Sequence, residues 1–187
     1  MDWQHLILMF VALTISLTVH EASHALFAML GGDRTAYHAG QVTLNPLPHM
    51  QREPFGMLVL PLMSLYLSGG SMCFGFAHAP VDALWAYHNP RKAALMSAAG
   101  PLSNALLAAI SFAVLYGIGR PESDAAETVR EIAKVFLLLN VLLAVFNLLP
   151  VPPLDGAGVV QGSRRVRAAS TRPCRTSPTA ASSSSSG

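Results

Sequence analysis

The sequence predicts an all-α membrane protein with about four transmembrane helices and a short irregular or β-like loop after the first helix. Hydrophobic residues make up 52% of the 187 residues, charged residues make up only 12%, and the mean hydropathy is +0.43. Soluble domains carry about 25% charged residues, so this composition argues against an ordinary cytosolic protein. The apolar residues also gather in long stretches, as membrane helices require.

Four apolar stretches are the expected membrane-spanning helices, and they cover about residues 3–30, 55–77, 93–118 and 132–149. Each is close to or above the roughly 20 residues that a helix needs to cross a bilayer. The second and third stretches contain no charged residue. Buried helices of a soluble core are a poorer interpretation, because a chain of this length cannot surround so much apolar helix with polar structure.

The segments between and after these stretches have a different character. Residues 31–54 open with two glycines and contain three X-Pro steps, which exclude a continuous helix, and residues 41–44 are a candidate short strand. From residue 161 the chain is rich in Arg, Ser, Thr and Pro. We therefore expect a membrane core over residues 1–160 and a disordered low-complexity tail over residues 161–187.

The charge distribution argues against nucleic-acid binding. Five of the 12 lysines and arginines lie after residue 161, where there is no acidic residue. The rest of the chain carries more acidic than basic residues. It therefore lacks the basic surface that binding to phosphates requires.

Ionisable residues within the first apolar stretch indicate a functional site, since such groups are costly inside a membrane. His20 and His24 are four residues apart and so share one face of a helix, where both imidazoles can reach one metal ion. Glu21 lies beside them and can hydrogen-bond a water held on that metal. This is the H-E-x-x-H arrangement of two zinc ligands and a general base. The alternative is a chance match with buried structural histidines.

A catalytic zinc site needs a third protein ligand and an open fourth position. Asp155 is the only charged residue between Val135 and Ser163, and it follows a helix-breaking segment with three prolines. Taken alone, such an aspartate is more simply a solvated residue at the end of a helix. Because the two-histidine motif lacks a third ligand, we favour Asp155 for that position.

Together these motifs resemble the site-2 protease family of intramembrane zinc metalloproteases. The resemblance covers roughly residues 5–160 and includes a softer match of residues 41–49 to a family loop. The residues that carry it are His20-Glu21-x-x-His24, Gly100-Pro-Leu-Ser-Asn104 and Asn147-x-x-Pro150-x-Pro152-Pro153-Leu154-Asp155-Gly156.

The resemblance implies one Zn²⁺ per chain, with His20, His24 and Asp155 as metal ligands. It also implies two catalytic residues: Glu21 as the general base and Asn147 as a donor that steadies the oxyanion. A helix–helix hydrogen bond is the alternative role for Asn147.

Two further asparagines lie on the expected helices. Asn140 shares roughly the same helix face as Asn147, and we expect it to serve packing. Asn104 is a candidate for contact with the metal-binding helix or with the substrate.

The resemblance further implies an intramembrane zinc endopeptidase that hydrolyses peptide bonds in transmembrane segments of other proteins. Its expected setting is the cell membrane, as a multi-pass protein, with the lipid bilayer and membrane-spanning substrates as partners. One alternative is a catalytically inactive scaffold of the same family, which the atypical C-terminal sequence favours and the intact Glu21 opposes. A metal or proton carrier is the other alternative.

The depth of the motifs in the membrane constrains the topology. If all four stretches cross fully, the first and fourth helices are antiparallel, and His20 and Asn147 lie at different depths. A tilted helix, a later start of the first span or a re-entrant second stretch removes this conflict. The broken segment at residues 41–48 is a candidate edge for pairing with an unwound substrate strand.

Overall fold

The computed structural model describes residues 3–170, with side chains through residue 166, and every regular element within that range is a helix. The elements in chain order are α1 (Trp3–Gly31), α2 (Thr35–His38), α3 (Pro46–Arg52), the π-helix η1 (Phe55–Val59), α4 (Leu60–Leu67), α5 (Ala83–His88), α6 (Pro90–Ile118), α7 (Asp124–Asn147) and α8 (Asp155–Ser170). The all-helical prediction is therefore confirmed for the described residues.

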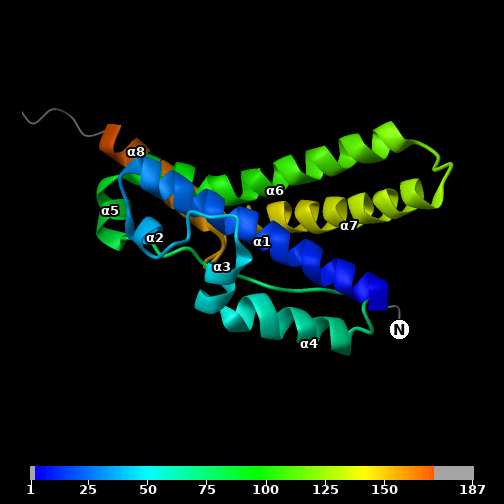
Figure 1. Cartoon of the computed structure of the whole chain (residues 1–187). Helices are drawn as coiled ribbons and strands as arrows, with labels where there is room; N and C mark the ends of the chain where they lie inside the picture. Colours follow the sequence, from blue (N-terminus) through cyan, green and yellow to red (C-terminus); the bar gives the residue numbers. More distant parts are fainter. Residues whose placement is uncertain (1–2, 171–187) are drawn as a thin grey trace, which may run out of the picture.

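Three long helices, α1, α6 and α7, pack side by side and form the body of the molecule (Figure 1). Two of them, α1 and α6, are long and apolar enough to cross a membrane. Helix α7 carries charged residues in its first half, from Asp124 to Lys134. The structure thus has two candidate spans, and the predicted four are not confirmed.

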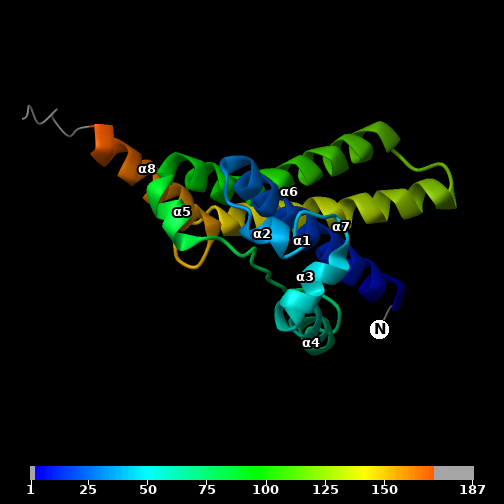
Figure 2. The ribbon, with the colours of Figure 1, turned by 60° about the vertical axis from the view of Figure 1, so that its left-hand side comes forward.

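The second apolar stretch doubles back within the protein, and we call it the re-entrant stretch (Figure 1). Its helical part ends at Leu67, and an irregular segment, residues 72–82, returns along α1 toward α5 (Figure 1). Figure 2 shows that α4 lies to one side of the three long helices. Because this stretch is re-entrant, α1 and α7 run in the same direction (Figure 1). The conflict of depth between His20 and Asn147 is thereby removed.

Close glycine contacts hold the re-entrant stretch together. The Phe76 amide donates a hydrogen bond to the Gly56 carbonyl oxygen over 3.1 Å. A Cβ at Gly56 would lie 2.1 Å from the Phe76 carbonyl oxygen, so no larger residue fits at this point. Behind the contact, Leu13, Leu17 and Met57 form part of the buried apolar core.

The loop after α1 differs from the predicted strand. Residues 42–44 form a bend, and α3 begins at Pro46. Asn45 caps α3, because its side-chain oxygen accepts a hydrogen bond from the Leu47 amide over 3.0 Å. An asparagine cap followed by proline at the first helical position is a strong start signal for a helix. This signal outweighs the β-propensity of residues 41–44, so the strand prediction was wrong.

The first ten residues of the predicted tail are helical, since α8 continues through Ser170. This helix packs closely on α6 through two glycines. A Cβ at Gly158 would lie 2.3 Å from Ser97 Oγ, and one at Gly162 would lie 2.6 Å from the Pro90 carbonyl oxygen. Residues 161–170 are therefore helical, and the rest of the predicted tail lies outside the described residues.

We expect Gly56→Ala to destabilise the protein by about 1–3 kcal/mol, the usual range for overpacking, because the new methyl group meets backbone that cannot move aside. Thermal unfolding in detergent measures the change. Gly117→Ala is the matched control: it lies in α6 with nothing within 4 Å of its Cβ, and alanine is the better helix former. Equal melting temperatures for Gly56→Ala and the control would contradict this packing.

Candidate metal centre

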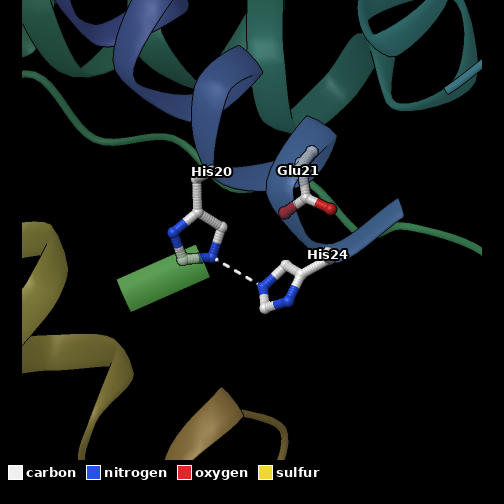
Figure 3. Close-up of side chains that lie close together, drawn as sticks. All are labelled: His20, Glu21 and His24. Carbon is white, nitrogen blue, oxygen red and sulfur yellow. Dashed lines mark hydrogen bonds between the residues drawn. The ribbon is translucent and has the colours of Figure 1, made fainter. Parts of the chain in front are cut away.

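Helix α1 presents His20, Glu21 and His24 at the interior of the bundle, and all three side chains are buried. Figure 3 shows the two imidazole rings next to each other, with the Glu21 carboxylate close to them. The Nε2 atoms of the two histidines are 3.1 Å apart. One ligand atom from each of the three residues lies within 4.8 Å of the others, as a shared metal ion requires. The helical spacing thus gives the geometry that the motif predicted.

Asp155 joins this cluster from the other end of the chain. The turn after α7 places its Oδ2 atom 3.0 Å from His20 Nε2 and 3.2 Å from His24 Nε2. Gly156 makes the turn possible, because a Cβ there would lie 2.3 Å from the Leu148 carbonyl oxygen. The structure therefore brings together the three residues that the sequence suggested as metal ligands.

The outer nitrogens of the two imidazoles are held by oxygen atoms of α6. His24 Nδ1 donates to the Met96 carbonyl oxygen over 2.7 Å, and His20 Nδ1 pairs with Asn104 Oδ1. An imidazole that carries its proton on Nδ1 has a lone pair on Nε2. Both lone pairs then face the cluster, as they do in zinc sites with oriented histidine ligands.

The electrostatics of the cluster favour a cation. Burial raises the pKa of the Asp155 carboxyl, but hydrogen bonds from a protonated Nε2 of His20 or His24 outweigh it and hold that pKa well below its ordinary value. When both imidazoles carry their proton on Nδ1 instead, no proton lies among the three ligand atoms. A carboxylate and two Nε2 lone pairs, all within 3.2 Å of one another, need a positive charge among them.

Two further observations show that His20, His24 and Asp155 fit a zinc ion. Ligands of a tetrahedral zinc at about 2.0–2.1 Å lie about 3.3 Å apart, close to the separations measured among the three ligand atoms. Gly100 keeps the space beside them open, because a Cβ there would lie 2.3 Å from His24 Nε2 and 2.6 Å from His20 Nε2. The sequence motif contained Gly100, but only the structure shows why a side chain is not tolerated.

The Glu21 carboxylate has one oxygen without a partner. Its Oε2 atom is buried and accepts no hydrogen bond from any described residue. An unpaired carboxylate oxygen in the interior is costly unless a ligand or a water completes it. Beside a metal, this oxygen is free to accept a proton from a bound water.

A cavity of about 470 Å³ opens beside the cluster, and both proposed catalytic residues line it together with the three ligands. Asn147 donates from Nδ2 to the Leu143 carbonyl oxygen over 3.0 Å, within its own helix. Its amide therefore keeps a second N–H.

The irregular segment, residues 72–82, forms another wall of the cavity through residues 75–79, which the sequence analysis did not assign to the site. Gly75 in this segment packs against the Gly56 backbone, because a Cβ at Gly75 would lie 2.9 Å from the Gly56 carbonyl oxygen. This tertiary contact cannot be predicted from the sequence.

Comparison with known proteins agrees with this geometry. The model of peptidase family M50 matches residues 8–122 and 117–177. Similar proteins include YwhC of Bacillus subtilis, which is 38% identical over 81% of this chain and 66% of its own length. Rip2 of Mycolicibacterium smegmatis is 35% identical over 83% of this chain and 56% of its own, and Rip2 of Mycobacterium tuberculosis is 32% identical over 79% and 53%.

All three relatives are named as zinc metalloproteases, and the chain spans between about half and two thirds of their length. No solved structure matches the chain. The family match covers most of the chain and includes the residues of the metal cluster. The chain therefore belongs to peptidase family M50, the site-2 protease family.

Proposed function

We propose that the protein is an intramembrane zinc endopeptidase that cleaves transmembrane segments of other proteins. The observation that carries this proposal is the convergence of His20, His24 and Asp155, with the free Glu21 oxygen beside them, inside a helical bundle. The names of the relatives support zinc as the metal and peptide hydrolysis as the reaction. Two apolar helices support a place in the cell membrane, as a multi-pass protein.

Each residue of the site has a chemical task in this proposal. His20, His24 and Asp155 would hold the zinc, which would supply Lewis acidity and lower the pKa of a bound water. Glu21 accepts a proton from the attacking water at its free oxygen and later passes it to the leaving amide nitrogen. Asn147 donates its remaining N–H to the negative charge that develops on the carbonyl oxygen.

The cavity also suggests where a substrate lies. A transmembrane helix hides its peptide bonds, so it must unwind before it is cut. We expected the segment at residues 41–48 to pair with the unwound strand, but residues from Pro46 onward belong to α3. The irregular segment lines the cavity at residues 75–79 and is the better candidate for that edge.

An intact, unpaired Glu21 in the cavity favours an enzyme over a catalytically inactive scaffold. A metal or proton carrier would place further ionisable groups along a path. Here four of the ionisable residues that line the cavity, His20, Glu21, His24 and Asp155, form one cluster, and His78 alone lies outside it.

Metal analysis tests whether the two distant motifs form one site. We expect detergent-purified protein to hold about one zinc per chain, and Asp155→Ala to lose most of it, because two histidines alone leave the site short of a ligand. Asp124→Ala, in the first turn of α7, is the control and keeps its zinc. Zinc retained in full by Asp155→Ala would show that this carboxylate is not a ligand.

Replacing the general base separates chemistry from binding. We expect Glu21→Gln to lower the rate of cleavage of single-pass membrane proteins by about 10²–10⁴-fold, the usual contribution of a general base. Its zinc content stays unchanged, because Glu21 is not assigned as a ligand. The measurement is the cleavage rate in detergent or liposomes, with Glu122→Gln as the control. Equal rates for Glu21→Gln and wild type would rule out this role.

A further inference from the structure

Three polar side chains lie behind the metal cluster, at the point where α1, α6 and α7 meet. They are Ser16 of α1, Asn104 of α6 and Asn140 of α7, and each is 0% exposed. Hydrogen bonds link them into a chain that ends at His20. Packing alone, the role we expected for Asn140, does not need such a chain. The direction of each hydrogen bond shows what this chain does.

The amide of Asn140 has a fixed direction. Its Nδ2 atom lies 2.9 Å from the Phe136 carbonyl oxygen, which can only accept a hydrogen bond. The same nitrogen donates to Ser16 Oγ over 2.9 Å. With the nitrogen held by these two acceptors, the Oδ1 atom of Asn140 must face Asn104.

The direction of Asn140 in turn sets the direction of Asn104. Asn140 Oδ1 can only accept, so the atom of Asn104 that lies 2.7 Å away must be its Nδ2 donor. The Oδ1 atom of Asn104 then faces His20 Nδ1. This oxygen also can only accept, and it is a closer acceptor for the proton of a neutral His20 than Asp155 Oδ2, which lies 3.0 Å from Nε2. The Asn104 contact therefore favours the proton on Nδ1.

We propose that Asn140 is a positioning residue for the metal site, which acts through Asn104 to keep the proton of His20 on Nδ1. His20 Nε2 then always offers a lone pair to the metal. This inference deepens the proposed function and rests on the metal site described there. It assigns a role to Asn140, which touches none of the three metal ligands directly.

The second histidine provides an internal comparison. His24 Nδ1 donates to the Met96 carbonyl oxygen, a backbone atom whose direction no side chain controls. The proton of His24 is therefore fixed by α6 itself. A change at Asn140 should alter His20 and leave His24 as it is.

The state of the two imidazoles can be measured without metal. In zinc-free protein labelled with ¹⁵N-histidine, we expect NMR spectra at a pH where both rings are neutral to show the proton on Nδ1 of His20 and of His24. In Asn140→Leu, a change of similar size, the direction of the Asn104 amide is held only by a long hydrogen bond of 3.5 Å from its Nδ2 to the Ser16 carbonyl oxygen. We then expect His20 to show a mixture of the two tautomers, with His24 unchanged. A wild-type His20 with its proton on Nε2 would overturn the proposal.

Zinc affinity, measured by competition with a chelator, gives a second test. We expect Asn140→Leu to weaken zinc binding about tenfold, the lower end of the effect of residues that orient metal ligands. Ser111→Ala is the control, because Ser111 is buried in α6 but bonds only the Leu107 carbonyl oxygen of its own helix. It should bind zinc as wild type does.

A double-mutant cycle distinguishes positioning from packing. In Asn104→Asp both side-chain oxygens are acceptors, so the proton of His20 stays on Nδ1 whatever lies at position 140. We therefore expect Asn140→Leu to change zinc affinity by less than about twofold in this background. A tenfold loss in both backgrounds would show a packing role and overturn the proposal.

Absence of zinc from wild type would contradict the proposed function, while the NMR result would still decide the role of Asn140.

Discussion

The structure depends on the need to compensate the polar and charged metal-binding side chains that lie inside an apolar helical bundle. Two imidazoles and a carboxylate in such an interior are costly unless hydrogen bonds and an opposing charge compensate them. Helix α6 supplies the acceptors, because the Met96 carbonyl oxygen accepts from His24 Nδ1 and Asn104 Oδ1 accepts from His20 Nδ1. Oriented in this way, the three ligand atoms point at one another and create a place for a cation.

The same constraint explains why glycines occur at the contacts around the site. Gly100 lets α6 approach the histidines closely enough to bond their outer nitrogens, and Gly156 lets α8 begin at Asp155, close to the turn that follows α7. Gly158 and Gly162 then seat α8 on α6. The helices come this close because these positions carry no side chain, and the metal ligands meet as a result.

Parts of this arrangement follow from sequence and parts do not. The i, i+4 spacing of His20 and His24 depends only on helix geometry, which is local and therefore predictable. Asp155 was identified because it is an isolated charge in an apolar region. The path of the second apolar stretch depends on contacts between residues far apart in sequence, such as Gly56 with Phe76, so hydropathy alone could not show that it doubles back.

Two other differences have equally specific causes. The Arg- and Ser-rich composition from residue 161 did not predict α8, because the contacts of Gly158 and Gly162 with α6 are tertiary contacts that composition does not contain. The role of Asn140 depends on the direction of its hydrogen bonds to two other helices, which no pattern along one helix contains.

The most direct test of the central claim is zinc X-ray absorption of the purified Asp155→Cys variant beside wild type. A cysteine at a ligand position adds a zinc–sulfur distance of about 2.3 Å, whereas histidine and carboxylate ligands give distances of about 2.0–2.2 Å. We predict nitrogen and oxygen neighbours with an imidazole signature in wild type, and one sulfur neighbour in the variant. Zinc bound in the variant with no sulfur neighbour would contradict the claim that the two distant motifs share one metal.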